Sequence, residues 1–203
     1  MTLHGTRPSA STEARLTNGA ESLAGQSEQP SNRVLRYVLA ALRLSLGWIF
    51  LWAFLDKAFA LGFSTGRDAE TGAVDRFGDA AWIHGGSPTN GFLKFGTKGP
   101  FADFYHGIAG AAWADWLFML ALLGIGLALV LGIGMRVAAT AGAALLLMMW
   151  SAVLPPETNP FMDDHIVYAI TLVALALAGA GKTLGFGNAW EQVPFVARRG
   201  YLK

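Results

Sequence analysis

The sequence predicts an all-α fold, a polytopic membrane protein whose four helices form a transmembrane bundle. Between Asp115 and Glu157 lie 41 residues whose only charge is Arg136. An α-helix rises about 1.5 Å per residue, so a hydrocarbon core of about 30 Å requires about 20 apolar residues. Arg136 divides the stretch into two segments of that length. Gly132 and Gly134, just before it, indicate a tight turn between two membrane-crossing helices.

The composition supports this class and excludes others. Hydrophobic residues make up 53% and charged residues 14% of the chain, whereas soluble domains have about 25% charged residues. The length of 203 residues suits one helical bundle with its loops, and the net charge of +1 argues against a nucleic-acid partner. The absence of cysteine excludes disulfides, thiolate catalysis, iron–sulfur clusters and covalently attached haem.

The chain divides into three parts. Residues 1–32 are polar and without apolar periodicity, which predicts a disordered tail and no cleaved signal peptide. Residues 33–190 form the membrane domain, and residues 191–203 form a basic C-terminal tail. The four expected spans are about Val34–Ala60, Trp116–Leu131, Val137–Leu154 and His165–Gly181.

Lysine and arginine near the span ends predict the orientation. Arg36, Arg136 and Lys182 are on one side, whereas the loop 155–164 on the other side has three acids and no basic residue. Both termini are therefore expected in the cytoplasm. The long loop from Leu61 to Ala114 is then extracytoplasmic, and its aromatic content predicts an ordered structure at the outer interface.

Ionisable residues within or against a membrane are functional candidates. Arg43 is in the first span, where it snorkels, bonds to a nearby carbonyl, or serves as the cationic partner of a quinone. Asp56 and Lys57 end this span. An aspartate gains nothing from the helix dipole at a C-terminus, so Asp56 is either structural or functional.

Three acids and a histidine mark the starts of the second and fourth spans. Asp115 is interpreted as a helix cap, and Asp163 and Asp164 fit the same role. His165 adds a side chain that exchanges protons near neutral pH. We expect these residues, with Asp56 and Lys57, to lie at one level on the outer rim of the bundle, where they form a proton exit or a polar ligand site.

Other chemistries lack support. No histidine is placed mid-span for a bis-histidine haem, and no ligand spacing favours a metal site built from His84, His106 and His165. A serine-nucleophile motif and a phosphate-binding loop are also absent. The spans have too few polar residues for a channel or transporter.

The chain resembles the DoxX/DoxD-like membrane proteins of bacteria. Four segments carry the resemblance: Phe50–Lys57, the loop Trp82–Leu93 with its Gly-Gly-Ser-Pro-Thr run, Asp115–Phe118 and Leu154–His165. The resemblance implies a bacterial plasma-membrane bundle linked to quinone-dependent oxidation. Its best-described relatives are DoxD-type subunits of thiosulfate:quinone oxidoreductase, which couple two thiosulfates to tetrathionate and pass electrons to quinone.

Two hypotheses follow. In the first, the chain is the membrane subunit of a quinone-linked oxidoreductase with an outer-face site for a small anion, such as thiosulfate. In the second, it is a non-catalytic accessory or scaffold subunit of a larger membrane complex, with the long loop as a docking surface. For the first hypothesis, the candidate residues are Asp56, Asp164 and His165 for catalysis, Lys57, Arg67, Lys94 and Lys98 for substrate, and Arg43 and Trp52 for ubiquinone or menaquinone.

Overall fold

The computed structural model describes residues 10–157 and 159–202, with side chains from Asn32 onward. The chain divides into two compact units, Met1–Val38 and Leu39–Lys203, and the packing described below is that of the second. Its described part is helical, and its only strand-like pairing is an isolated bridge between Arg67 and Val74.

Helix α1 extends from Ala10 to Phe59 and therefore begins well before the expected start at Val34. The tail expected to be disordered over residues 1–32 is thus helical from residue 10, and residues 1–9 lie outside the described residues. Alanine, glutamate, glutamine and leucine make up about half of residues 10–32. These residue types have favourable helix propensity. The prediction of disorder relied on the lack of apolar periodicity and did not take this propensity into account.

Three helical segments are long and apolar enough to cross a membrane. They are Asn32–Phe59 of α1, α3 over Ala112–Leu131 and α4 over Met135–Ala152. Helix α5 covers only Asp164–Leu177, 14 residues, in place of the fourth span expected over His165–Gly181. At about 1.5 Å per residue this helix is about 21 Å long. It ends early because Gly179 adopts a left-handed conformation.

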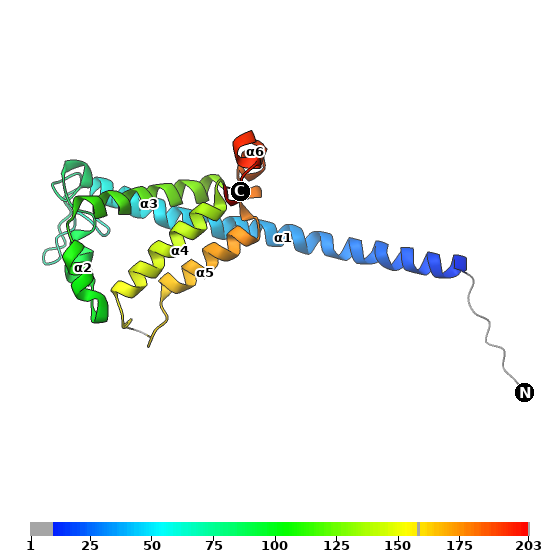
Figure 1. The fold of residues 1–203 in the computed structure, drawn as a ribbon, viewed down its shortest axis with the longest axis horizontal. Coiled ribbons are helices and arrows are strands. Elements are labelled where there is room, and N and C mark those ends of the chain that lie inside the picture. Colours follow the sequence, from blue (N-terminus) through cyan, green and yellow to red (C-terminus); the bar gives the residue numbers. More distant parts are fainter. Residues whose placement is uncertain (1–9, 158, 203) are drawn as a thin grey trace, which may run out of the picture. The chain divides into compact units, whose positions relative to one another are not determined.

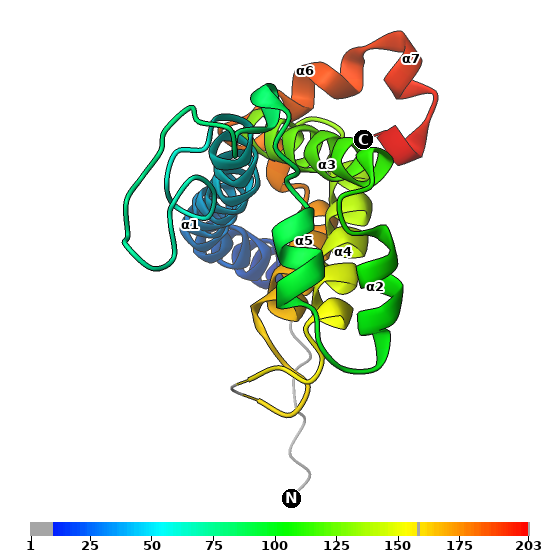
Figure 2. The ribbon, with the colours of Figure 1, turned by 90° about the vertical axis from the view of Figure 1, so that its left-hand side faces the viewer.

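Helices α3, α4 and α5 pack together with the second half of α1 around an apolar core (Figures 1 and 2). Met119, Leu129, Leu172 and Leu175 are fully buried in it. Gly126 brings α3 against α1, because a Cβ atom there would lie 2.8 Å from the backbone nitrogen of Leu51. The glycine therefore serves packing within the bundle, as small residues do where membrane helices approach closely.

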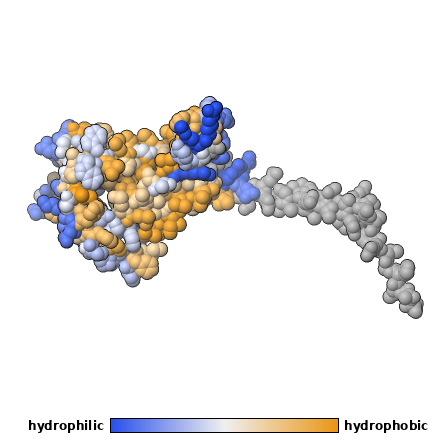
Figure 3. Space-filling view, viewed as in Figure 1, coloured by the Kyte–Doolittle hydropathy of each residue, from blue (hydrophilic) through white to orange (hydrophobic). Residues whose placement is uncertain are grey.

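The outer surface of the bundle is apolar between two polar ends (Figure 3). Leucine, valine and isoleucine side chains cover α3, α4 and α5 on this surface, where they are exposed: Leu117, Leu120, Leu127, Val137, Leu147, Val167, Ile170, Val173 and Leu177. A contiguous apolar surface of this kind around buried-core helices is typical of a protein whose solvent is lipid.

Residues 60–111 connect α1 to α3, and we call them the cap. They contain η1 (Trp82–His84), η2 (Phe92–Gly96), η3 (Gly99–Phe101) and the helix α2 (Ala102–Ile108). The cap is bonded to the end of α4. The Tyr105 hydroxyl donates to the Met148 carbonyl at 3.0 Å, and the Lys98 backbone N–H donates to the Ala152 carbonyl at 2.9 Å.

The C-terminal segment, residues 183–202, folds back onto the opposite end of the bundle. It contains α6 (Gly187–Gln192), α7 (Pro194–Ala197) and η5 (Gly200–Leu202). The Phe186 backbone N–H donates to the Leu131 carbonyl at 2.8 Å, and Arg136 Nη1 donates to the Gly200 carbonyl at 2.9 Å. The part expected to be a basic tail from residue 191 onward is therefore helical and bonded to the start of α4.

Candidate functional site

Arg43 has a structural role at the end of the bundle away from the cap. Its side chain is completely buried. Nη1 donates to the carbonyls of Leu129 and Val130 at the end of α3. Nη2 donates to the carbonyls of Thr183 and Leu184, at 3.2 and 2.8 Å. The guanidinium thus joins α1, α3 and the C-terminal segment through four carbonyls, the structural alternative that the sequence left open.

Trp52, the other residue expected at a quinone site, is nine positions further along α1. Nine residues correspond to about 2.5 turns and about 13.5 Å, so the two side chains leave the helix on opposite sides. Trp52 instead contacts Phe63 of the cap, with ring centroids 5.0 Å apart in an edge-to-face arrangement. Arg43 and Trp52 therefore do not share one binding site.

Asp56 anchors the first turn of the cap. Its carboxylate is 1% exposed. It accepts hydrogen bonds from the Phe63 N–H at 3.0 Å, the Ser64 N–H at 2.9 Å and the Ser64 hydroxyl at 2.7 Å. Lys57 Nζ donates to the same hydroxyl at 3.0 Å. These donors explain an aspartate at a helix C-terminus, because they provide the stabilisation that the helix dipole does not.

Asp115 anchors a second turn of the cap, the one around Thr89. Its interpretation as the N-cap residue of a helix was wrong. Helix α3 already begins at Ala112, so Asp115 lies inside its first turn and is 7% exposed. Its Oδ1 accepts from the Ser87 hydroxyl at 2.9 Å, the Thr89 N–H at 3.0 Å and the Thr89 hydroxyl at 2.6 Å. Within the described residues, Oδ2 accepts no hydrogen bond and retains its capacity for a ligand.

An open cavity of about 480 Å³ lies beside Asp115. Trp82 and Trp116 form two of its walls, with ring centroids 4.7 Å apart at an interplanar angle of 73°. Gly85, at φ 95°, ends η1 in the left-handed region that glycine adopts without strain, which turns the chain along the cavity edge. The cavity thus combines a flat apolar surface with one carboxylate, at the level where α3 begins.

Asp163, Asp164 and His165 form a separate group at the start of α5. Asp163 is the helix cap that the sequence predicts, since its side chain accepts from the Ile166 N–H. It also lies 2.8 Å from His165 Nδ1, and Asp164 Oδ1 lies 3.7 Å from the same atom. One ligand atom from each residue fits within 4.8 Å, although Asp164 is exposed.

The structure separates the polar rim that the sequence predicts into three groups. Among the described hydrogen bonds and ion pairs, none joins Asp56, Asp115 and His165 to one another. In this arrangement no hydrogen bond connects the three groups into one path for protons. Asp164 and His165 remain candidates for proton handling, on the geometry of their own group alone.

The four cations expected to bind substrate are also dispersed. Arg67 donates to the carbonyls of Gly62 and Gly72 within its own turn. Lys98 Nζ lies 2.5 Å from Glu157 Oε1, and its hydrogen bond and positive charge lower the pKa of that carboxyl. Lys94 lies 5.8 Å from the ring centroid of Phe95. With Lys57 bonded to Ser64, three of the four cations already stabilise the cap.

Sequence reasoning missed the residues that hold the two buried carboxylates. Ser64, Ser87 and Thr89 are their donors, and Trp82 completes the cavity. The available signal was the Gly-Gly-Ser-Pro-Thr run, a turn rich in hydroxyl groups with apolar flanks. Its pairing with Asp115 spans 26 residues of sequence to Thr89, beyond any local pattern.

No protein-family model, no curated protein and no solved structure matches this chain. The resemblance to DoxX/DoxD-like proteins therefore rests on the motif residues alone. The chemistry of the cavity has to be argued from its own side chains.

Proposed function

We propose that this chain is the membrane subunit of a quinone-linked oxidoreductase and that the cavity lined by Trp82 and Trp116 holds the quinone head group. The observation that carries the proposal is the buried Asp115 carboxylate, which lines an aromatic cavity and whose Oδ2 is unpartnered among the described residues. Volumes of about 300–1,000 Å³ with few polar groups are typical of small-molecule sites, and this cavity has about 480 Å³.

The residues fit a quinone in three respects. The two indole rings provide apolar contact for a planar ring. Three donors hold Asp115 Oδ1, which fixes the orientation of Oδ2 and leaves it to accept a hydrogen bond from a hydroxyl group. Trp113 and Trp116 are exposed at the start of α3, as tryptophans are at a membrane interface.

A bound quinone would supply two-electron, two-proton redox chemistry. The role of this chain would be to bind the ring, orient it and accept a hydrogen bond from a quinol hydroxyl at Asp115 Oδ2. Asp164 and His165 would exchange protons with solvent at their own group near the membrane surface. Because three of the four candidate cations already bond within the chain, we assign oxidation of a small anion such as thiosulfate to a partner subunit.

The membrane arrangement that we propose has four spans, with both termini in the cytoplasm of a bacterial plasma membrane and the cap outside. Helix α5 qualifies as the fourth span by its environment rather than by its length. Leu172 and Leu175 are buried in the bundle core, whereas Val167, Ile170, Val173 and Leu177 are exposed in a row along its outer side. A helix with both surfaces apolar belongs in the membrane.

A second candidate function is that of a non-catalytic accessory subunit. Aromatic side chains exposed on the cap favour it: Phe63, Phe77, Phe95, Phe101 and Phe104. Two buried carboxylates hold the cap, so it presents these rings from an ordered framework to a partner subunit. In this role the Trp82–Trp116 cavity would be part of the docking surface and would contain no quinone.

The deciding experiment is mass spectrometry of the protein after gentle extraction from its native membrane, scoring bound quinone and co-purifying subunits together. Trp116→Ala is expected to lower quinone retention about fivefold, from the loss of about 1 kcal/mol of aromatic contact. Trp113→Ala is the matched control, because Trp113 is 60% exposed and lies outside the cavity walls. Stoichiometric partners without any quinone would favour the accessory role.

Asp115→Asn tests the hydrogen-bond-accepting role of Oδ2. Asparagine retains an oxygen for Ser87 and Thr89 while placing a donor nitrogen where Oδ2 was. The variant should retain the oxidised quinone and lose preference for quinol, whose hydroxyl requires an acceptor. An unchanged ratio of quinol to quinone bound by this variant would contradict the assignment of Asp115.

A further inference from the structure

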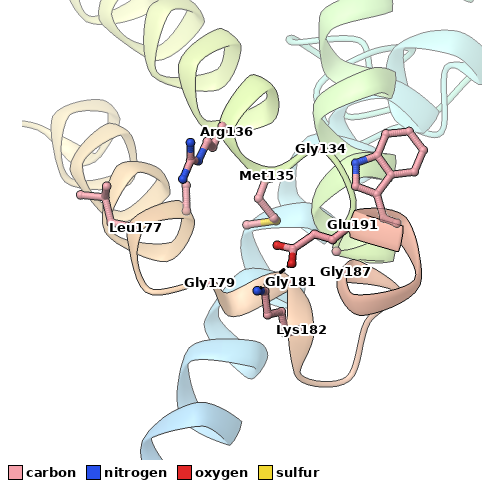
Figure 4. Close-up of a pocket in the computed structure, with 12 residues that line it drawn as sticks. Gly134, Met135, Arg136, Leu177, Gly179, Gly181, Lys182, Gly187 and Glu191 are labelled. Atoms are coloured by element: carbon pink, nitrogen blue, oxygen red, sulfur yellow. Dashed lines mark ion pairs between the residues drawn. The ribbon is translucent and has the colours of Figure 1, made fainter. Parts of the chain in front are cut away.

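A second cavity lies at the end of the bundle away from the cap. It has a volume of about 340 Å³, and its walls come from the start of α4, the end of α5 and the C-terminal segment (Figure 4). Arg136, Lys182 and Glu191 are its charged residues. The function proposed above makes no use of this cavity, which lies at the end of α3 opposite the Trp82–Trp116 cavity.

The charges in this cavity favour an anion. Lys182 Nζ lies 2.9 Å from Glu191 Oε2, so these two side chains neutralise one another (Figure 4). Arg136 donates only through Nη1, to the Gly200 carbonyl at 2.9 Å. Within the described residues, its Nε and Nη2 make no hydrogen bond. The cavity therefore has one net positive charge and guanidinium donors with capacity for further acceptors.

The position of the cavity is the head-group layer of the membrane. Arg136 is the second residue of α4, a helix long and apolar enough to cross the bilayer. Leu177, the last residue of α5, also lines the cavity and is 84% exposed. An apolar wall thus leads from the charged groups along the surface of α5, where acyl chains would lie.

The C-terminal segment has the composition of a membrane-surface element. The segment contains Arg198 and Arg199 and one acid, Glu191, and it is flanked by Lys182 and Lys203. Apolar side chains are exposed along the segment: Leu184, Phe186, Val193, Phe195 and Tyr201. Arg199 lies over Phe195, with its guanidinium carbon 3.7 Å from the ring centroid. Exposed aromatic and aliphatic residues next to basic residues are typical of segments that lie in the interface of anionic membranes.

We propose that this cavity binds the phosphate of an anionic phospholipid head group through Arg136 and Lys182. A lipid is favoured over free phosphate because the exposed Leu177 side chain extends the charged cavity into an acyl-chain surface. Basic cavities between membrane helices are suited to phospholipid head groups of this charge. Arg136 also donates a hydrogen bond to the Gly200 carbonyl. A lipid bound at Arg136 therefore holds the C-terminal segment against the start of α4.

Glu191 makes the proposal specific. Its carboxylate competes with a lipid phosphate for Lys182, because both are anions directed to the same ammonium group. Neutralising Glu191 should therefore increase retention of anionic lipid, whereas neutralising either cation should decrease it. A purely structural role of the Lys182–Glu191 pair predicts no opposite effects of this kind.

The test is native mass spectrometry of the full chain reconstituted with equal amounts of phosphatidylglycerol and phosphatidylcholine of matched acyl chains. The wild type should retain phosphatidylglycerol in preference. Arg136→Gln and Lys182→Gln should each reduce this preference about fivefold, because one basic residue contributes about 1 kcal/mol to binding an anionic lipid surface. Glu191→Gln should raise it, and Arg136→Lys, which retains the charge, should stay closest to the wild type.

Arg198→Gln is the matched control, since it removes one charge from the same segment at an exposed position outside the cavity. An equal loss in Arg198→Gln and Arg136→Gln would overturn the proposal in favour of general surface attraction. Displacement of phosphatidylglycerol by millimolar inorganic phosphate would overturn the lipid assignment. If Arg136→Gln fails to fold, Lys182→Gln must still lose more of the preference than Arg198→Gln, and an equal loss in these two variants would overturn the proposal.

Discussion

Replacing Arg43 with glutamine removes the side chain that joins α1 to the end of α3 and to the C-terminal segment. Among the described residues, the carbonyls of Val130, Thr183 and Leu184 accept hydrogen bonds only from Arg43, whereas the Leu129 carbonyl also accepts from the Gly132 N–H. Three carbonyls therefore lose their only donor. At about 1–3 kcal/mol for each unsatisfied group, part of which water or the new amide recovers, the unfolding free energy should fall by about 3–5 kcal/mol.

The assay is thermal unfolding of purified protein in detergent, followed by loss of monodisperse protein on size exclusion after heating. A change of this size corresponds to a Tm lower by about 10 °C in a chain of this length. Arg36→Gln is the matched control, because Arg36 lies two turns earlier on α1 and is exposed. A Tm for Arg43→Gln within about 2 °C of the Arg36→Gln value would refute the carbonyl-binding role.

Three other outcomes follow from the structure. Asp56→Ala should speed amide hydrogen exchange at Phe63 and Ser64 at least tenfold, because both N–H groups lose their acceptor, while exposed Asp68→Ala should leave them unchanged. The pKa of Glu157 is lowered by Lys98, so the contact between these two side chains should be complete above the ordinary glutamate pKa. It should weaken as the pH falls through that lowered pKa, which exchange of the Lys98 amide, itself bonded to the Ala152 carbonyl, measures. Because the chain has no cysteine, Thr71→Cys and Arg198→Cys can be labelled singly in cells. The four-span arrangement predicts labelling of Thr71→Cys alone by an impermeant maleimide, and labelling of both would show that α5 does not cross.

The class of fold was predictable because hydrophobic length is a local property of sequence. The charge-free segments around Arg136 indicated α3 and α4 within a few residues of their observed ends. The limits of α1 and α5 were not predictable in the same way. Helix propensity without periodicity extends α1 back to Ala10, and the left-handed Gly179 ends α5 before the apolar run ends.

The site was only partly predictable, because its contacts are long-range. The sequence identified Asp56, Asp115 and Arg43 as unusual, since an ionisable residue in an apolar segment is visible in the chain itself. Their partners were not visible. Asp115 bonds to Thr89, 26 residues earlier, and Arg43 bonds to Leu184, 141 residues later. The local pattern therefore favoured an N-cap role for Asp115. In the structure Asp115 instead anchors the turn around Thr89 in residues 60–111 and lines a cavity.

The most direct test of the central claim is photolabelling with an azidoquinone in native membranes, followed by peptide mapping of this chain. The proposed site predicts label on peptides containing Trp82–Gly86 and Ala112–Trp116, the two segments that line the cavity. Label should fall about fivefold in the Trp116→Ala variant and be retained in Trp113→Ala. Label confined to peptides around Arg43, or no label above that of a control membrane protein, would contradict the account.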